Sequence, residues 1–476
     1  MAHMTSRVES EPSGASSNLQ MDGLAQALYE RYRCPDAFVK LSLGAPLSAS
    51  CGFFTFGHDI ICYGHSAAGY LLPRAKPGLY DVSQNVLLTD SGICLPFDAA
   101  QVIQNLRLER YVGQESRLRT VARKAYYAVR PILPRAASKH IQRLNLRGWR
   151  KRAFPGWPVD RTVELLCERL LMLLLETSGT SRIPFIWFWP EGHVGCVVMT
   201  HDIETEAGRN YCPQLMDIDD DFGIKASFNV VPEGSYTVAP DYLASIRDRG
   251  FEIGIQDLNH DGRLFDNRNE FLRRAHLINK YGAQYGAKGF RAAVLYRNPD
   301  WYDALKFSFD MSIPNTGHMD PQPGGCCTVM PYFIGDILEL PVTTTQDYTL
   351  CHLLREHTID LWKEQTRLIL DKNGLISFIV HPDYVIHDRL NSLYKHLLGH
   401  LRELKSKTNT WVALPSEVDR WWRARSRMRL VASGNTWHIE GEGSGRGVLA
   451  YASKVDGKLA YELDSGAAHV GSPPSA

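Results

Sequence analysis

The sequence has no long apolar run, little excess charge and no internal repeat that we can find. Its 53 Lys and Arg residues almost balance its 52 Asp and Glu residues, which leaves a formal charge of +1. This ordinary composition excludes disorder of the whole chain and gives no reason to expect a nucleic-acid partner. The apolar stretch at 170–175 is too short to cross a bilayer.

Cysteine is also sparse, and its spacing fits neither a metal motif nor a disulfide framework. Only ten cysteines occur in 476 residues, and Cys326 and Cys327 are adjacent, so they cannot readily bridge each other. Residues 1–20 are rich in small and polar residues and lack the apolar centre of a secretory leader, so we expect a disordered, tag-like start. Together these features predict reduced thiols and a cytoplasmic location.

Composition shifts along the chain predict five segments. Short apolar runs with glycine turns indicate a small β-rich domain near the start and a second β-rich segment at the end, and either could bind a glycan or a partner or serve as a packing module. The predicted boundaries are 1–20 (tag-like), 21–110 (β-rich), 111–160 (basic helical linker), 161–425 (α/β barrel) and 426–476 (β-rich segment and tail).

Residues 117–152 contain twelve Lys or Arg residues and no Asp or Glu. Aromatic and aliphatic residues are interleaved with these charges, a pattern typical of a peripheral element on an anionic membrane surface. A solvated helical linker, or one that pairs with acidic surface elsewhere, explains the pattern equally well. The sequence therefore leaves both a membrane partner and a plain linker open.

The most informative stretch is Val-Val-Met-Thr-His-Asp-Ile-Glu at 197–204, an apolar run that ends in two carboxylates. Alternate side chains of a strand share a face, so Asp202 and Glu204 can aim at one point while Ile203 points the other way. Two carboxylates in one cleft suit a metal ligand beside a general base, or an acid/base pair. A strand that simply runs into a solvated loop is the plain alternative.

The chain after this strand alternates apolar runs with amphipathic helical stretches, which predicts a parallel α/β architecture. Eight strand candidates in about 230 residues favour a barrel, in which functional side chains gather at the carboxyl ends of the strands. The further strand candidates are 226–231, 251–255, 289–293, 307–313, 337–342, 375–380 and 411–414, and the helix candidates include 241–249, 270–281, 359–370 and 390–404.

Other polar residues follow these strands. Gln256 and His260 are four residues apart and could reach one ion, although a carboxamide is a poor ligand for a transition metal. Arg291 could orient Asp202 or lie on the surface. His381 ends a strongly apolar run, where an imidazole without a partner would be costly, so it is functional or firmly hydrogen-bonded.

The order of these motifs resembles the polysaccharide deacetylases, carbohydrate esterase family four. The resemblance covers about residues 190–420 and rests on five motifs: Thr-His-Asp-Ile-Glu (200–204), Gly-Phe-Glu-Ile-Gly-Ile-Gln-Asp-Leu-Asn-His (250–260), Gly-Phe-Arg-Ala-Ala (289–293), Leu-Glu-Leu-Pro (338–341) and Phe-Ile-Val-His-Pro (378–382). It implies a distorted (β/α) barrel that removes acetyl groups from glycans with a divalent metal, usually Zn²⁺.

On this resemblance Asp202 matches the general base, Arg291 its tether and His381 the general acid. Glu204 and His260 match metal ligands, and Gln256 or Asp257 would complete the site. Three departures stand out: Ile203 replaces a metal-binding aspartate, Gln256 replaces a histidine, and alanines replace the prolines after Arg291.

The implied function is removal of an acetyl group from a glycan or a glycan precursor, lipid-linked precursors included, during polysaccharide biosynthesis. Two alternatives remain from the sequence: a glycan-binding or scaffolding relative that has lost the metal, and a hydrolase of non-sugar amides on the same barrel.

Overall fold

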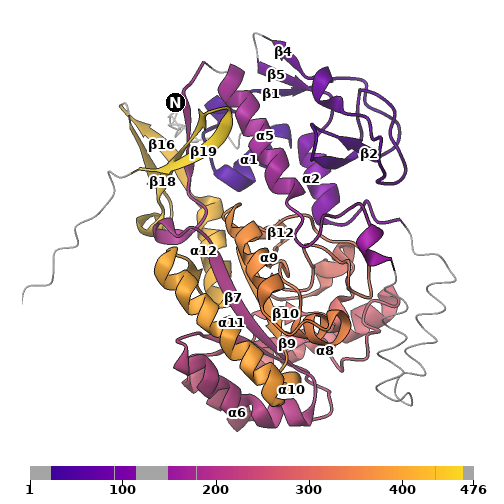
Figure 1. The fold of residues 1–476 in the computed structure, drawn as a ribbon, viewed down its shortest axis with the longest axis vertical. Helices are drawn as coiled ribbons and strands as arrows, with labels where there is room; N and C mark the ends of the chain where they lie inside the picture. Colours follow the sequence, from indigo (N-terminus) through magenta and orange to yellow (C-terminus); the bar gives the residue numbers. More distant parts are fainter. Residues whose placement is uncertain (1–22, 90–91, 114–147, 178, 435, 465–476) are drawn as a thin grey trace, which may run out of the picture.

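One nine-stranded sheet organises the larger part of the chain (Figure 1). The computed structural model describes residues 23–89, 92–113, 148–177, 179–434 and 436–464. The sheet has the order β12-β13-β11-β10-β9-β8-β7-β14, with β15 also paired to β7, and every pairing is parallel except that of β12 with β13. Its strands are β7 (Cys196–Ile203), β8 (Ala226–Val230), β9 (Glu252–Gln256), β10 (Gly289–Arg291), β11 (Phe309–Asp310), β12 (Tyr332–Ile334), β13 (Ile337–Glu339), β14 (Leu375–Val380) and β15 (Trp411–Val412).

This sheet confirms the predicted α/β barrel, in a distorted and incompletely paired form. β7 and β14 are buried along their whole length, as expected for parallel strands covered on both faces. The gap between β13 and β14 is bridged by side chains: the hydroxyl groups of Thr343 and Thr344 donate to the carbonyls of Leu375 and Ser377, at 2.8 and 2.7 Å. The curled sheet is therefore closed on this side by threonine hydroxyls instead of a backbone ladder.

The strand expected at 307–313 is regular only at Phe309–Asp310, and after it the pairing continues as single hydrogen bonds and an isolated bridge between Pro314 and Val342. This interruption has a local cause. Both carboxylate oxygens of Asp310 accept hydrogen bonds from Ser312, one from its amide at 3.1 Å and one from its hydroxyl at 2.7 Å. This turn interrupts the regular ladder after Asp310, although the Met311 amide still donates to the Phe290 carbonyl of β10.

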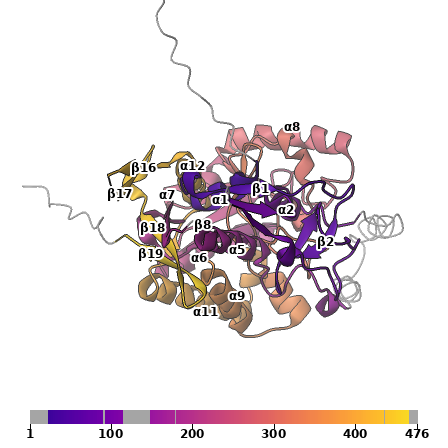
Figure 2. The same cartoon turned by 90° about the horizontal axis from the view of Figure 1, so that it is seen from above.

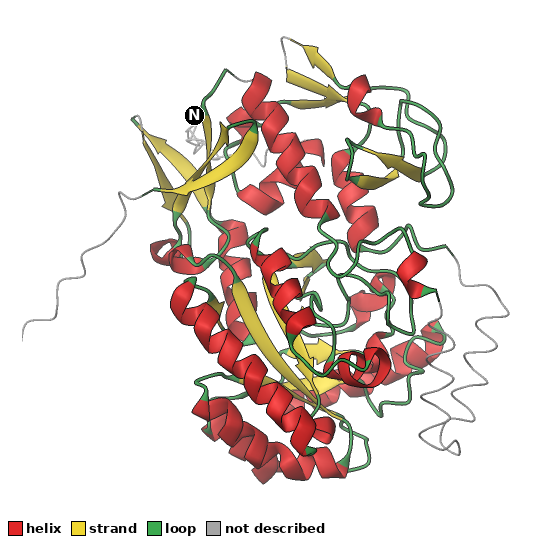
Figure 3. Ribbon diagram, viewed as in Figure 1, coloured by secondary structure: helices red, strands yellow, loops and turns green. Residues whose placement is uncertain are grey.

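Helices cover the outside of the sheet (Figure 3), and α8 and α11 lie on opposite sides of it (Figures 1 and 2). Helix α8 begins where the side chain of Asn267 accepts a hydrogen bond from the Glu270 amide, and it ends at Gly286 with a φ of +61°. The helices of this layer are α6 (Glu206–Asp221), α7 (Pro240–Asp248), α8 (Arg268–Tyr285), α9 (Asp360–Leu370), the short α10 (Pro382–Val385), α11 (Asp388–Lys407) and α12 (Pro415–Arg427).

The segment expected to be β-rich at 21–110 contains short strands together with two helices. A three-stranded sheet of order β1-β5-β4 and a hairpin of β2 and β3 lie beside helices α1 and α2. The elements are α1 (Gly23–Tyr32), β1 (Leu41–Leu43), β2 (Gly52–Thr55), β3 (Ile61–Gly64), β4 (Leu87–Thr89), β5 (Gly92–Leu95) and α2 (Ala99–Arg107).

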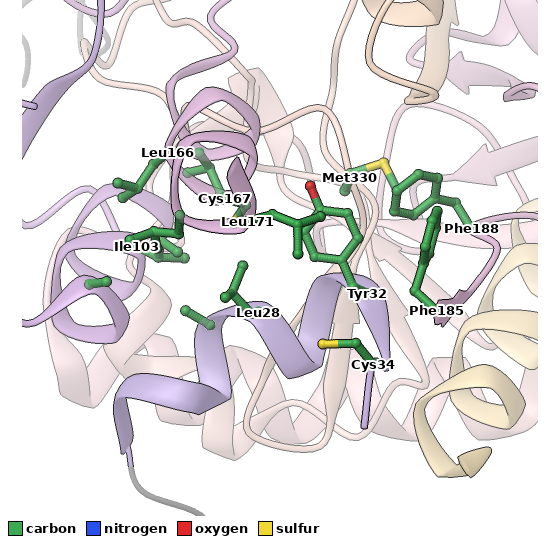
Figure 4. Packing of buried hydrophobic residues seen from close by; sticks show 14 of the residues in the cluster. Leu28, Tyr32, Cys34, Ile103, Leu166, Cys167, Leu171, Phe185, Phe188 and Met330 are labelled. Carbon is green, nitrogen blue, oxygen red and sulfur yellow. The ribbon is translucent and has the colours of Figure 1, made fainter. Parts of the chain in front are cut away.

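The N-terminal and C-terminal segments share one core, which is built around helix α5 (Thr162–Thr177) (Figure 4). Leu166 and Leu171 of α5 pack with Leu28 and Tyr32 of α1 and with Phe185 in β6 (Arg182–Ile186). The C-terminal strands β18 (Leu449–Val455) and β19 (Lys458–Leu463) extend a sheet from β6, and β16 (Arg429–Ser433) pairs with β17 (Thr436–Glu440). Although the barrel segment was expected to begin at residue 161, α5 therefore lies in this shared core.

A buried ion pair joins the N-terminal segment to a barrel loop. The guanidinium of Arg297 binds both carboxylate oxygens of Glu109, with Nε to Oε2 at 2.7 Å. Both side chains are almost completely buried. The contact fixes the region after α2 against the loop that follows β10.

Most of the basic stretch lies outside the described residues, which include only 148–152 of it. The membrane-surface association that its charge predicts therefore stays a prediction. Among the residues that the structure describes, no helix is long and apolar enough to cross a membrane.

Candidate active site

The carboxyl ends of four neighbouring strands bring polar side chains together. Asp202 on β7 is the register partner of Asn229 on β8, and Gln256 on β9 is the register partner of Arg291 on β10. All four residues are at most 3% exposed. The parallel order of the strands thus places residues separated by up to 89 positions at one end of the sheet.

Asp202 is held by donors from three directions. Its Oδ1 accepts a hydrogen bond from Asn229 Nδ2 at 2.7 Å and lies 3.4 Å from Nε of Arg291. Its Oδ2 accepts from Nε2 of Gln256 at 3.3 Å. A cation and two amides therefore orient this carboxylate, which is what a positioned base needs. Gly254 leaves space for this arrangement, because a Cβ there would collide with the side chain of Asn229.

Arg291 also donates from its Nη2 to the Thr200 hydroxyl at 2.9 Å. Its charge acts on Glu339, one of two buried carboxyl groups nearby. Asp310 and Glu339, register partners at the ends of β11 and β13, are fully buried. Burial and the neighbouring Asp310 raise the pKa of Glu339 well above its ordinary value, and burial raises the pKa of Asp310. Burial therefore favours the protonated form of both carboxyl groups, and of Glu339 most.

His381 forms a dyad with Asp347. Nδ1 of His381 lies 2.6 Å from Oδ1 of Asp347, and its backbone amide donates to Oδ2 at 2.8 Å. Burial alone would lower the pKa of His381, but the charges of Asp347, Glu204 and Asp202 outweigh burial and raise this pKa to about 10. The imidazole is therefore protonated at neutral pH, and Asp347 fixes its orientation.

Glu204 lies between two imidazoles. Its Oε1 is 2.9 Å from Nε2 of His260 and 3.6 Å from Nε2 of His381. Asp383 fixes the backbone here, because its carboxylate accepts from the Glu204 amide at 3.2 Å and from the Thr205 hydroxyl. The structure thus brings predicted metal ligands and the predicted acid to one point.

The other two predicted ligands have different surroundings. Gln256 uses its Nε2 to bind Asp202, while its Oε1 is buried and accepts no hydrogen bond from the described residues. Asp257 is fully buried, its Oδ1 accepts from the Leu258 amide at 2.6 Å, and burial raises its pKa.

These positions test whether the chain's residues fit a zinc ion. A catalytic zinc site uses three ligands from the protein. Within the described part of the chain, no group of three or more His, Cys, Asp or Glu side chains is arranged to hold a metal ion. Only Glu204 and His260 of the four predicted ligands meet, so these residues do not make up a zinc site by themselves.

His201, which flanks Asp202 in the sequence, points away from this site. Its Nε2 lies 3.0 Å from Oδ2 of Asp219 on α6 and its Nδ1 lies 3.0 Å from the carbonyl of Val380. The Tyr394 hydroxyl donates to the same Asp219 carboxylate at 2.5 Å. The fully buried His201 therefore ties β7 to the surrounding helices.

The sequence reasoning missed several residues of the site. Asn229 could have been found from the sequence, because it is a polar residue within the apolar run 226–231. Glu339 could also have been found, because it is the carboxylate residue of the motif at 338–341. No local pattern marks Asp347, because its partner is 34 residues away and only the fold brings the two together.

No family model matches the chain, and no curated protein matches it. Similar solved structures were found. One is a protein from Mycobacterium smegmatis assigned as a polysaccharide deacetylase, with 19% identity, 53% of this chain and 98% of that chain covered, and a TM-score of 0.41. The allantoinase Puue has 11% identity, 49% and 92% coverage and a TM-score of 0.40.

A third similar structure is a Bordetella bronchiseptica protein assigned as a polysaccharide deacetylase involved in O-antigen biosynthesis, with 19% identity, 49% and 86% coverage and a TM-score of 0.30. Polysaccharide deacetylases, the family that the motifs resemble, are thus among the solved structures to which this chain is similar. We base the function on the geometry of the chain's own residues.

Proposed function

We propose that the chain is a hydrolase that removes an acetyl group from a sugar of a glycan or glycan precursor. The observation that carries this proposal is the pairing of two differently charged groups at one end of the barrel: a carboxylate oriented by Arg291 and an imidazolium oriented by Asp347. A positioned base beside a positioned acid is the pair of groups that acyl transfer to water requires.

Each of the two groups has one proton to move. As water attacks the acetyl carbon, Asp202 accepts the proton that the water loses. When the bond from the acetyl carbon to the sugar nitrogen breaks, the protonated Nε2 of His381 gives its proton to that nitrogen. Acetate and an amino sugar are the products, and an O-acetyl substrate would give acetate and a hydroxyl in the same way.

We assign no step to a metal, because only Glu204 and His260 of the predicted ligands converge. Dependence on a divalent ion, with Zn²⁺ as the ion that the motifs imply, remains a separate hypothesis. It is tested by measuring metal in the purified protein and after incubation with zinc, cobalt or manganese.

The decisive experiment is Asp202→Asn with acetate release from a panel of acetylated saccharides. We expect the variant to fold and to lose activity by about 10²-fold to 10⁴-fold, because it has lost the base but keeps its shape. Asp248→Asn on the exposed side of α7 is the matched control and should keep full activity. Full activity in Asp202→Asn, or an unfolded protein, would refute the assignment.

A non-catalytic saccharide-binding relative is the second candidate. The specific observation in its favour is Gln256, which stands where the motif resemblance places an imidazole ligand and which is bound to Asp202. Saccharide binding by the wild-type chain with no acetate release, with or without added metal, would favour this candidate over the hydrolase.

A further inference from the structure

A cavity of about 550 Å³ lies outside the Asp202–His381 site. Trp149, Trp157 and His318 line one part of it. Another part is lined from the end of the π-helix at Thr349–Leu354 into α9, by Leu354, Glu356, Thr358, Asp360, Leu361 and Glu364. Its volume is in the range of sites that hold small molecules. Neither the proposed base nor the proposed acid contributes to it.

The aromatic residues of the cavity are packed against one another. The rings of Trp149 and Trp157 are 4.8 Å apart at an interplanar angle of 70°, and the ring of His318 is 5.7 Å from that of Trp157. Both tryptophans are only half-buried. Aromatic faces that remain accessible inside a cavity suit a ligand that has flat apolar faces of its own.

The polar residues of the cavity carry both signs of charge. Glu356, Asp360 and Glu364 are exposed around it, together with Arg150 and Arg152. Burial lowers the pKa of His318 to about 4, so its imidazole is neutral at physiological pH. Charged groups of both signs can hydrogen-bond hydroxyl groups, whereas a polyanion or a polycation would meet repulsion from part of the lining.

Trp157 borders both the cavity and a second void near the loop that carries Asp347. The lining of this small void includes Thr345, Gln346 and Gln365. Gln365 bridges the two regions, since its Nε2 donates to the carbonyl of Pro158 and its Oε1 accepts from the Thr345 amide. Asp347, which orients His381, follows two residues later in the same loop.

We propose that this cavity is a saccharide-binding subsite, in which the indole of Trp157 stacks on a sugar ring and the acidic and basic side chains bind its hydroxyl groups. The claim that the cavity serves the reaction rests on the proposed function. The claim that the cavity binds a saccharide is independent of it. As a subsite of the enzyme it would hold a non-reacting part of the substrate, so the substrate class would be oligosaccharides rather than single sugars.

The test measures saccharide binding to the full chain by calorimetry and saturation-transfer NMR. The probes are tetrasaccharides of β-1,4-linked N-acetylglucosamine, glucose and xylose, with N-acetylglucosamine as the monosaccharide. Trp157→Ala should weaken tetrasaccharide binding about tenfold, because a stacking face is lost. Trp411→Ala is the matched control, since Trp411 is a half-buried tryptophan at the amino end of the barrel sheet and lines neither void, and it should bind as the wild type does.

Glu364→Gln keeps the test valid if Trp157→Ala fails to fold, because Glu364 is exposed on α9. It should weaken tetrasaccharide binding severalfold without changing the unfolding temperature. A wild-type chain that binds none of the tetrasaccharides at millimolar concentration, or cavity variants that fold and bind them normally, would overturn the subsite.

Acetate release separates this proposal from the proposed function. With an active enzyme, Trp157→Ala should raise KM for an acetylated tetrasaccharide and leave hydrolysis of an acetylated monosaccharide unchanged. Tetrasaccharide binding that depends on Trp157, in a chain that releases no acetate, would refute the hydrolase and support the subsite.

Discussion

The substitution Asp347→Asn tests whether the charge of Asp347 keeps His381 protonated. In the wild type the carboxylate of Asp347 contacts His381 twice, through Nδ1 at 2.6 Å and the backbone amide at 2.8 Å. Asparagine keeps the shape of the side chain but removes its charge. An opposite charge at this distance commonly shifts a pKa by about one to three units. We therefore expect the pKa of His381 to fall from about 10 to between about 7 and 9.

The same change should alter how stability depends on pH. The folded pKa of His381, about 10, lies above its ordinary value of 6.5, so the stabilisation is complete below pH 6.5 and is lost as the pH rises through 10. This difference corresponds to about 5 kcal/mol of unfolding free energy across that window. With a lower folded pKa of His381, the Asp347→Asn variant should lose less stabilisation as the pH rises. Its unfolding free energy should therefore vary less between pH 6.5 and 10 than that of the wild type.

Three measurements check this reasoning: the pH dependence of kcat, the titration of His381 by NMR, and urea unfolding at pH 6 and pH 10. The alkaline limb of the rate profile and the NMR titration should move down together. Asp371→Asn, on the barrel surface, should move neither. An alkaline limb that stays near pH 10 in Asp347→Asn would show that the proton on His381 does not depend on this carboxylate.

Three further substitutions test separate features of the structure. Arg291→Lys should lower kcat about tenfold to a hundredfold with little change in KM, because an ammonium group cannot reproduce the planar contacts that orient Asp202; unchanged kcat would refute this role. Gln256→His should raise the zinc content measured after dialysis, because it adds an imidazole ligand, and an unchanged zinc content would argue against a metal at this point. Glu109→Gln should lower the unfolding free energy in urea by about 3 kcal/mol, because it leaves Arg297 charged and buried without its partner; a loss well below this would mean that the pair contributes little to joining the two segments.

The barrel could be predicted from the sequence because its signals are local. A strand that is buried on both faces, such as β14, appears as a nearly continuous apolar run, here interrupted only by Ser377, and the polar residue that follows it marks the strand's end. This rule places Asp202, Arg291 and His381 at the carboxyl ends of β7, β10 and β14, where the structure has them. Parallel pairing then places such residues together without further information, since all the strand ends lie at one edge of the sheet.

Features that depend on contacts between distant segments could not be predicted in this way. Helix α5 is apolar on most of its surface, which indicates a buried helix but not the elements that bury it. Its neighbours, α1 and β18, lie more than a hundred residues away on either side in the sequence. The predicted boundary at residue 161 therefore lies directly before α5, the helix around which the N-terminal and C-terminal segments pack.

The buried carboxyl groups of the barrel explain why Arg291 remains available to Asp202. Arg291 lies near Asp202 and also near Glu339, and it would divide its charge between them if both were ionised. Burial and the nearby Asp310 raise the pKa of Glu339 and so favour its protonated form, while Asp310 accepts two hydrogen bonds from Ser312. Protonation of Glu339 leaves more of the Arg291 charge for Asp202. Asp310 and Glu339 take no part in the proposed proton transfers, yet the raised pKa of Glu339 helps Arg291 to orient the base.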